Sequence, residues 1–384
     1  MLLNFHDYRA AAKRRLPRFL FDYIDRGTED ETGPRRHRSD LDAISLLPEM
    51  LTGHDQRDLT TTVFGRTLAL PVAVAPTALA GLVAYDGELM LARGVAHAGV
   101  PYCISTQSVT TVERIREAAP NANLWFQLYV WRNRDLTRGL LQRAAACGIT
   151  TLVVTADTPV LPNREYNLRN GLTIPLKPGG RVALDLLRHP GWTLSVLLGY
   201  LRQGGMPVYG HYPEAFRNSV ARAQLASEVA IDHRLNWDDI ASLRRDWAGE
   251  LVVKGLLSVA DARRAADLGA EGVVVSTHGA RNLDSAITTA RALPPIVDAV
   301  GGRVTVLADS CVQRGSDVVK YMGLGARAVL LGRAPLWGLA AGGEPGLRGV
   351  LSMLGNEIDL TLALLGRARL EKLETCIARE GDAQ

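Results

Sequence analysis

The sequence has few of the features that mark disulfide-rich, zinc-binding or nucleic-acid-binding proteins. Its 384 residues include four cysteines, and none of them has the CxxC spacing. Three of the four lie in apolar or strand-like surroundings, which indicates reduced thiols in a cytosolic chain rather than disulfides or a metal site. The formal net charge is only +4, and no long block of Lys or Arg occurs. Nucleic acid is therefore not an expected partner.

Long hydrophobic segments are also missing. No stretch of about 18 uncharged apolar residues occurs, as a membrane-spanning helix would require. The N-terminal stretch 1–24 lacks an apolar core followed by a small-residue cleavage site, so it predicts an amphipathic helix rather than a signal peptide. With 47% hydrophobic and 22% charged residues, the composition is that of an ordinary globular protein. The length fits either two domains or one large α/β barrel.

Eight short runs of β-branched and apolar residues predict the strands of the fold. Continuous rather than alternating apolarity is expected of strands that are buried on both faces, as in a parallel sheet. The eight runs cover residues 71–75, 102–105, 125–130, 151–156, 251–255, 272–276, 304–308 and 328–332.

Helix-length segments separate most of these runs, and most end in a glycine just before the next strand, which suits a left-handed helix terminus. Eight strands close a (β/α)8 barrel, whereas a doubly wound sheet usually has fewer strands and a switch point. We therefore predict one α/β domain over residues 1–384, a (β/α)8 TIM barrel. Residues 1–65 are expected to form a helical and irregular N-terminal cap. Residues 168–232 are expected to form a long loop insertion after strand 4.

The residues just past the strand ends are rich in polar and ionisable side chains. Chemistry in such barrels belongs to this rim, so their shared position indicates a site. The residues at these positions include Pro76, Thr77, Ala78, Ser105, Gln107, Gln127, Tyr129, Thr155, Asp157, Lys254, His278, Arg281, Asp309, Gly332 and Arg333.

Several of these residues have a structural explanation as well. Lys254 either forms a structural ion pair or contacts a ligand, because an ammonium at a buried strand end needs an anionic or electron-rich partner. Asp157 either caps the turn before Pro159 or acts in the site. Gly332 and Arg333 follow the last strand, where such barrels commonly bind phosphate.

His278 taken alone is better explained as a buried or turn histidine. Its neighbours favour chemistry instead. Gly279 permits a tight exit from the strand, Arg281 offers a fork for an anion, and Asp157 can orient the imidazole from across the barrel. A base oriented by a carboxylate, beside a cation that holds an acidic substrate, is a recognisable catalytic arrangement.

The motifs together resemble those of the FMN-dependent α-hydroxy acid oxidases and dehydrogenases, which include glycolate oxidase, lactate dehydrogenase and mandelate dehydrogenase. The resemblance covers nearly the whole chain, in the expected order and with the expected spacing. It rests on the segments FDYIDRGTEDE (21–31), PVAVAPTAL, LWFQLYV, TADTP, NRE (163–165), LVVKGLLS, THGARNLD and AVLLGRAPLWGLAAGGEPG.

This resemblance implies FMN as the cofactor. The flavin ring would lie against Pro76, Thr77 and Ala78, with contacts from three further residues, and Lys254 would lie at its N1/O2 edge. Gly332 and Arg333 would hold the phosphate, together with the loop that begins at Asp309 and contains Cys311 and Gln313. The three further contacts are Ser105, Gln127 and Thr155.

The resemblance also implies how an L-2-hydroxy acid would be held and oxidised to the 2-oxo acid. Arg164 and Arg281 would clamp the substrate carboxylate with help from Tyr23, and Tyr129 would contact the hydroxyl. His278 would take a proton, and the neighbouring Asp157 would stabilise the imidazolium. The sequence leaves open whether that proton comes from the hydroxyl or from the α-carbon.

The chain departs from the usual family pattern in two places. It reads STHGARNLD where the family usually has SNHGGRQLD, and the extra methyl of Ala280 costs little unless φ is positive there. In the phosphate loop, the chain has Cys311 where the family usually has a glycine and Gln313 where it usually has an arginine. Losing one charge-assisted phosphate contact costs about 1.5–3 kcal/mol, or one to two decades in affinity. We do not expect the adjacent Arg314 to compensate, so FMN binding is expected to be weak.

Two features bear on the substrate and the electron acceptor. Gln107 stands where short-chain oxidases often carry a bulky aromatic residue, which favours a mandelate-like acid over glycolate. Ala78 matches oxidases, whereas membrane-type dehydrogenases often have glycine at this position. Some dehydrogenases also carry alanine, so oxygen, a quinone or another acceptor all remain open. A flavin-free barrel that binds a phosphorylated metabolite and a repurposed, flavin-poor homologue remain as alternatives.

The insertion contains HPGWTLSVLLGY, which resembles the segment that attaches mandelate and lactate dehydrogenases to the inner face of a bacterial membrane. Its apolar residues would then lie at the membrane interface, beside Arg188 and Arg202. The alternative is that they pack on the barrel or on a neighbouring subunit. We expect a cytoplasmic homotetramer. Peripheral contact with the membrane is the alternative location to be tested. The apolar residues are Trp192, Leu194, Val196, Leu197, Leu198, Tyr200 and Leu201.

Overall fold

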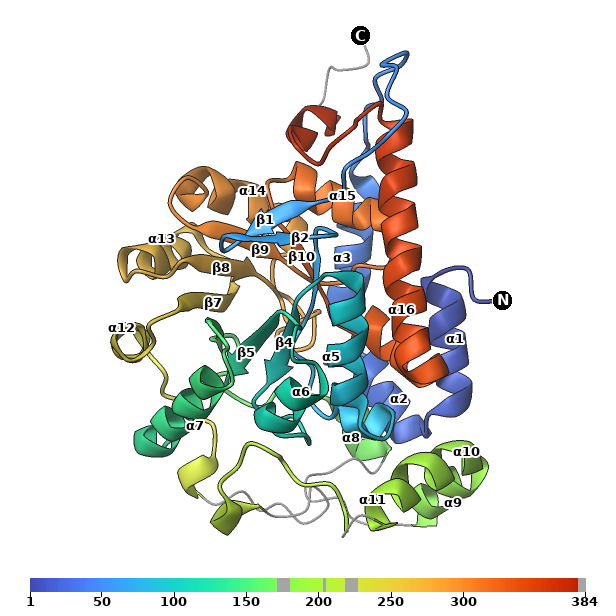
Figure 1. The fold of residues 1–384 in the computed structure, drawn as a ribbon, viewed down its shortest axis with the longest axis vertical. Coiled ribbons are helices and arrows are strands. Elements are labelled where there is room, and N and C mark those ends of the chain that lie inside the picture. Colours follow the sequence, from blue (N-terminus) through green and yellow to red (C-terminus); the bar gives the residue numbers. More distant parts are fainter. Residues whose placement is uncertain (171–179, 203–204, 218–226, 379–384) are drawn as a thin grey trace.

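Eight parallel strands form a closed barrel at the centre of the computed structural model (Figure 1), which describes residues 1–170, 180–202, 205–217 and 227–378. Around the barrel the order is β10, β3, β4, β5, β6, β7, β8 and β9, which confirms the predicted (β/α)8 fold. The strands are β3 (Val72–Val74), β4 (Tyr102–Ser105), β5 (Leu124–Leu128), β6 (Thr151–Thr155), β7 (Glu250–Leu256), β8 (Gly272–Val275), β9 (Thr305–Ala308) and β10 (Val329–Leu331).

The strands read as continuous apolar runs because both of their faces are buried. In β8, Val274 belongs to the cluster that fills the barrel interior, together with Val252 and Leu307. Its neighbours Val273 and Val275 belong to the larger cluster between the barrel and the surrounding helices. Alternate side chains of one strand therefore stabilise two separate cores.

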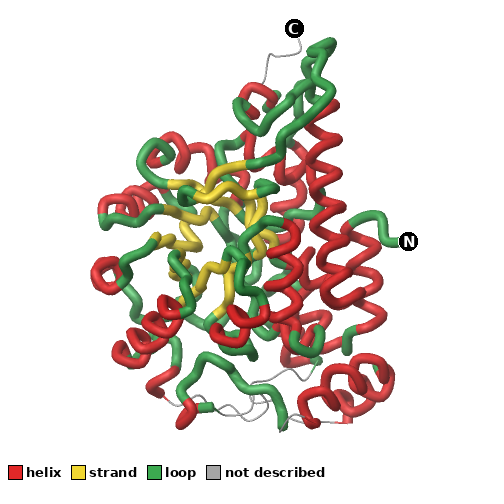
Figure 2. The backbone as a smooth tube through the Cα atoms, in the orientation of Figure 1, coloured by secondary structure: helices red, strands yellow, loops and turns green. Residues whose placement is uncertain are grey.

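Helices surround this barrel, as the tube view makes plain (Figure 2). Several begin at a side-chain cap: in α12 the Asn236 side chain accepts hydrogen bonds from the backbone amides of Asp238 and Asp239. The outer helices are α5 (Gly87–Ala98), α6 (Val112–Ala118), α7 (Arg134–Ala146), α12 (Trp237–Asp246), α13 (Val259–Asp267), α14 (Thr289–Val300), α15 (Gly315–Gly323) and α16 (Arg333–Leu364), and the short α4 (Ala80–Val83) follows β3.

A β-hairpin, rather than irregular chain, ends the N-terminal cap. It consists of β1 (Thr61–Val63) and β2 (Arg66–Leu68), and its turn has positive φ at Phe64 and Gly65. The hairpin residues Val63 and Leu68 are buried and belong to the interior cluster of the barrel. The hairpin spans the predicted boundary at about residue 65 and covers one end of the barrel interior.

The N-terminal helices pack across the molecule onto elements from the other end of the chain. α1 (Phe5–Arg15) lies against α16, as Figure 1 shows, and α2 (Arg18–Asp25) follows it. The next helix, α3 (Thr32–Ala43), begins at the carboxylate of Asp284, which accepts hydrogen bonds from the amides of Thr32 (2.9 Å) and Gly33 (2.7 Å). The loop after β8 thus fixes the cap that carries Tyr23.

The insertion after β6 forms short helices beside the cap. They are α8 (Glu165–Arg169), α9 (Gly180–Arg188), α10 (Pro190–Trp192), a π-helical turn (Thr193–Leu197) and α11 (Leu198–Arg202). Trp192 and Val196 are buried against the protein, whereas Leu194 and Leu201 are exposed. The seven apolar residues predicted to lie at one interface therefore do not share one environment, since some face the protein and others face solvent. The parts 171–179, 203–204 and 218–226 of the expected insertion lie outside the described residues.

Candidate active site

A cavity of about 830 Å³ lies at the C-terminal ends of the barrel strands, under the N-terminal cap. Each predicted site residue lines it except Asp157, which contacts His278 instead. The predicted residues along its wall are Tyr23, Pro76, Thr77, Ala78, Ser105, Gln107, Gln127, Tyr129, Thr155, Arg164, Lys254, His278, Arg281, Asp309, Cys311, Gln313, Gly332 and Arg333.

His278 and Asp157 form the pair that the sequence predicted. The Nδ1 atom of His278 lies 3.0 Å from Oδ1 of Asp157. Burial raises the pKa of Asp157, but the charges of His278 and Lys254 outweigh it and hold the pKa at about 2. Burial lowers the pKa of His278 below its ordinary value, more than Asp157 raises it. His278 is therefore neutral near pH 7 and able to accept a proton.

Gly255 makes the close approach of Asp157 possible. It has φ +103°, and a Cβ atom there would lie 2.5 Å from the Cβ of Asp157. The pairing of β7 with β8 also shifts register between Lys254 and Leu256. A glycine at this irregularity lets β7 point Lys254 into the barrel mouth while the carboxylate from the neighbouring strand passes close to the backbone.

Lys254 is both ion-paired and open to the cavity. Its Nζ donates a hydrogen bond to Oγ of Ser276 (2.8 Å) and lies 3.2 Å from Oδ2 of Asp309. Burial alone would lower the pKa of Lys254, but Asp309 and Asp157 raise it above its ordinary value. The ammonium is therefore charged and forms the structural ion pair, while its contact with a ligand stays a prediction.

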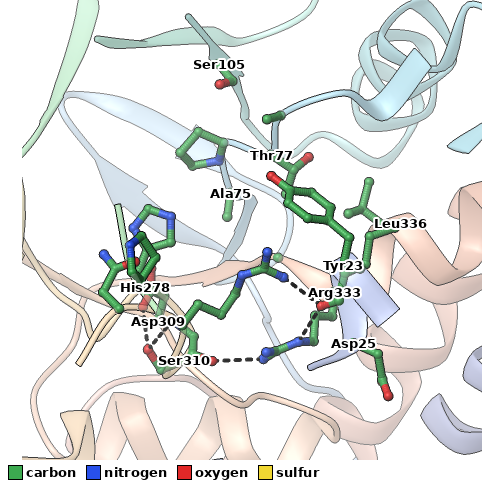
Figure 3. A pocket seen from close by; sticks show the side chains of 18 of the residues that line it. Tyr23, Asp25, Ala75, Thr77, Ser105, His278, Asp309, Ser310, Arg333 and Leu336 are labelled. Atoms are coloured by element: carbon green, nitrogen blue, oxygen red, sulfur yellow. Dashed lines mark hydrogen bonds between the residues drawn. The ribbon is translucent and has the colours of Figure 1, made fainter. Parts of the chain in front are cut away.

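Three arginines meet around Tyr23 without an acidic partner among the residues that the structure describes. Arg281 donates to the carbonyl of Ile24 (2.8 Å), and Arg164 donates to the carbonyl of Arg281 (3.2 Å). Their guanidinium carbons lie 5.0 Å and 5.9 Å from the centre of the Tyr23 ring. Arg333, which lies near Tyr23 in Figure 3, donates to the carbonyls of Ile24 (3.0 Å) and Gly279 (3.1 Å). These uncompensated charges suit anionic ligands.

A row of neutral polar side chains lies on the side of β3 to β6. Ser105 donates to the side-chain oxygen of Gln127 (3.2 Å), whose amide donates to Oγ1 of Thr155 (3.0 Å). The buried hydroxyl of Thr77 has no hydrogen-bond partner in the described structure. An unpaired buried hydroxyl at the cavity wall, together with Gln127 and Lys254, fits the polar edge of a flavin, so these residues fit FMN.

The loop expected at the phosphate is strained where the family usually has small residues. Ser310 has φ +92° and Cys311 has φ +58°, values at which side chains other than glycine are disfavoured. Gln313 lines the cavity, whereas Arg314 pairs with Glu357 (2.7 Å) and so cannot replace the missing arginine. Ala280 also has a positive φ (+57°), so its methyl group makes the backbone conformation less favourable than a glycine would.

Tyr209 and Ser310 are among the cavity residues that sequence reasoning missed. Tyr209, from the insertion, is buried, lines the cavity and stacks on Tyr212 with ring centres 4.9 Å apart. Ser310 is buried beside Asp309 and Arg333 (Figure 3). The aromatic cluster in PVYGHY was the only signal for Tyr209, since no strand end precedes it. Ser310 gave no signal, because its role depends on backbone angles.

Comparison with known proteins gives one consistent answer. The family model of FMN-dependent dehydrogenases matches residues 12–379. The L-lactate dehydrogenase of Caulobacter vibrioides (strain NA1000 / CB15N) is 43% identical over 377 residues, which cover 97% of each chain. The L-lactate dehydrogenase of Pseudomonas syringae pv. syringae (strain B728a) is 41% identical over 373 residues, again 97% of each chain.

Solved structures extend this similarity to the fold. The crystal structure of (S)-mandelate dehydrogenase, described as a monotopic membrane protein, superposes with a TM-score of 0.91 at 39% identity over 97% of each chain. A mandelate oxidase variant with (S)-mandelic acid superposes with a TM-score of 0.81 at 32% identity, also over 97% of each chain.

Proposed function

Because the chain belongs to the family of FMN-dependent dehydrogenases and is an FMN-dependent 2-hydroxy acid oxidoreductase, we propose that it oxidises a lactate-like or mandelate-like L-2-hydroxy acid to the 2-oxo acid. One observation carries the proposal. The neutral His278, paired with Asp157, lines the same cavity as Arg164 and Arg281, which have no carboxylate partner among the described residues.

The substrate carboxylate is held by Arg164 and Arg281. Two guanidinium forks next to each other repel, and burial and Arg164 lower the pKa of Arg281 to about 9. A carboxylate between them removes this repulsion and accepts hydrogen bonds from both. Tyr23, in contact with both guanidiniums, closes this end of the site.

His278 takes the proton that leaves the substrate. The pair with Asp157 fixes the ring so that Nε2 is free for the substrate, and the carboxylate stabilises the imidazolium that forms. Tyr129 remains a neutral hydroxyl, since burial and Asp157 raise its pKa to about 12. It therefore serves as a hydrogen-bonding partner of the substrate hydroxyl rather than as a second base.

FMN, when bound, supplies the two-electron acceptor for the oxidation. Pro76, Thr77, Ala78, Ser105, Gln127 and Thr155 would hold its ring, with the charged Lys254 at the edge where negative charge develops. The loop 309–313 with Gly332 and Arg333 would hold its phosphate. Arg333 already lies at the first residue of α16, where the helix dipole also favours an anion.

The substrate side chain is expected beside Gln107 and the buried Tyr209, which both line the cavity. A polar amide next to an aromatic ring leaves room for a methyl or an aryl group. Anaerobic titration of the purified, FMN-loaded protein with L-lactate and with (S)-mandelate tests substrate and chemistry together. Bleaching of the flavin absorbance by either acid supports the proposal, and intact absorbance with both contradicts it. Parallel assays of hydrogen peroxide release and quinone reduction then identify the electron acceptor.

We also propose peripheral contact with a membrane through the insertion. Four leucines of α9 to α11 are exposed, while Trp192 and Val196 of the same segment anchor it to the protein. In the part of the chain that the structure describes, no helix is long and apolar enough to span a bilayer. An amphipathic segment with Arg188 and Arg202 suits attachment to the surface of an anionic membrane. The exposed leucines are Leu184, Leu187, Leu194 and Leu201.

Sedimentation with anionic lipid vesicles tests this contact. Replacing the four exposed leucines by serine is expected to move the protein from the vesicle pellet to the supernatant. Replacing Leu360 and Leu364, two equally exposed leucines of α16, is the matched control and should leave sedimentation unchanged. Equal sedimentation of both variants would contradict the assignment.

A further inference from the structure

The turn that follows β8 is held by hydroxyl groups at every step. The amides of Thr277 and Gly279 both donate to Oγ of Ser310 (3.2 Å each). The amide of His278 donates to Oγ of Ser276 (2.9 Å), and that of Ala280 donates to Oγ1 of Thr277 (3.2 Å). Four successive amides therefore donate to three side-chain hydroxyls, and the amide of Ala280 also donates to the carbonyl of Thr277 (3.0 Å).

These hydrogen bonds oppose an unfavourable backbone conformation. His278, Gly279 and Ala280 have φ of +57°, +70° and +57°. The left-handed region is disfavoured for histidine and alanine, so the turn does not persist by local preference alone. The hydrogen bonds to the hydroxyls stabilise this backbone conformation, and the backbone conformation sets the direction of the His278 side chain.

The same hydroxyls belong to a buried ring of contacts that joins three strands. Ser310 donates to Oδ1 of Asp309 (2.8 Å), and the other carboxylate oxygen of Asp309 lies 3.2 Å from Nζ of Lys254. Lys254 donates to Oγ of Ser276 (2.8 Å), which accepts the amide of His278. Figure 3 shows Ser310 and Asp309 next to His278. The expected phosphate loop and the turn that carries the base therefore share one hydroxyl, that of Ser310.

Thr277 extends the ring to the N-terminal cap. Its Oγ1 lies 2.9 Å from Oγ of Ser310 and 2.8 Å from Nε2 of His37 in α3. The Ser310 hydrogen is directed to the Asp309 carboxylate, which can only accept. The Thr277 hydrogen then points to Ser310, and His37 donates from Nε2. In this direction the two lone pairs of Ser310 Oγ are shared by three donors, namely the amides of Thr277 and Gly279 and the Thr277 hydroxyl.

We propose that Ser310 and Thr277 are positioning residues for His278, and that through Ser310 they couple the phosphate loop to the placement of the base. The proposal rests on the role of His278 as base in the proposed function. Neither residue touches the reacting atoms. Both act by fixing the turn 277–280, so their loss should slow the chemical step more than it weakens substrate binding.

A pair of substitutions at Ser310 separates the hydroxyl from backbone strain. Ser310→Ala removes the hydroxyl and keeps a side chain at φ +92°, whereas Ser310→Gly removes the hydroxyl and relieves the strain. We expect kcat in the FMN-saturated full-length protein to fall about 10- to 100-fold in both variants, with KM changed less than about 3-fold. Wild-type kcat in Ser310→Gly would overturn the proposal, because backbone conformation alone would then explain the residue.

A second pair at Thr277 provides a rescue. Thr277→Val keeps the shape and loses the hydroxyl, whereas Thr277→Ser keeps the hydroxyl. We expect the valine variant to lose kcat about 10-fold and the serine variant to recover it. Equal loss in both variants would contradict the proposal, because a packing defect and not the hydroxyl would then be responsible.

Amide hydrogen exchange of the peptide that contains residues 276–284 gives a readout that needs neither FMN nor substrate. We expect faster exchange in both Ser310 variants and in Thr277→Val, and wild-type exchange in Thr277→Ser, at temperatures below the melting point of each protein. Unchanged exchange in the Ser310 variants would overturn the proposal. If the wild-type protein oxidises neither lactate nor mandelate, the proposed function fails, while this exchange experiment still decides whether the hydroxyls hold the turn.

Discussion

The Nδ1 atom of His278 lies 3.0 Å from Oδ1 of Asp157, although 120 residues separate them in the sequence. Asp157→Asn should keep the size of the side chain and remove the charge that stabilises the imidazolium. We expect kcat to fall at least about 100-fold, as for other bases that lose their orienting carboxylate. Steady-state kinetics on the FMN-saturated variant measure it. A fall of less than about 3-fold would show that His278 is not paired with Asp157 during turnover.

The pH dependence of kcat/KM should report the titration of His278. A base acts in its unprotonated form, and the pKa of this histidine lies below its ordinary value because burial outweighs the effect of Asp157. We therefore expect a flat profile from about pH 6.5 up to the pKa of Arg281 at about 9, and a tenfold loss per pH unit on an acid limb at lower pH. An acid limb centred above pH 7 would contradict this. In Asp157→Asn, the limb should move further toward acid, since the influence that raises the pKa is gone.

Arg281 should determine the requirement for a carboxylate in the substrate. Arg281→Met removes one guanidinium fork and is expected to lower kcat/KM for lactate or mandelate at least about 100-fold. The same variant should lose most of the preference for the acid over its carboxamide, which the wild-type enzyme is expected to show. Arg281→Lys keeps the charge without the fork, so its kcat/KM should lie between those of the wild type and Arg281→Met. Unchanged discrimination in Arg281→Met would place the carboxylate elsewhere.

Gln313 should limit the affinity for FMN. Wild-type protein is expected to lose flavin on extensive dialysis, and Gln313→Arg is expected to lower the dissociation constant about 10- to 100-fold by restoring one charge-assisted contact. Fluorescence titration of the apoprotein with FMN measures the dissociation constants of both proteins. Arg314→Gln serves as the control and should leave the affinity unchanged, because Arg314 pairs with Glu357. Stoichiometric flavin after dialysis of the wild type would contradict the expectation.

Much of this site followed from the sequence because barrel closure brings strand ends together. Once the apolar runs predict eight parallel strands, residues such as Asp157, Lys254 and His278 must share one rim, whatever their separation in the chain. The side chains named at that rim do line one cavity or contact a residue that does.

The remaining features depend on geometry that residue patterns do not contain. The hydroxyl of Ser310 matters because φ is +92° there and because the β8 turn lies beside it. Tyr209 reaches the cavity from an insertion without strand periodicity. Tertiary packing decides which face of the insertion is covered, with Trp192 buried and Leu194 exposed.

The contact between α1 and α16 has a consequence for how the chain is made. A ribosome releases the first helix more than 300 residues before its partner is complete, which is on the order of tens of seconds at ordinary rates of synthesis. The barrel strands emerge in the meantime and can pair in order. The contact of α1 with α16 therefore forms only after residues 333–364 have been synthesised.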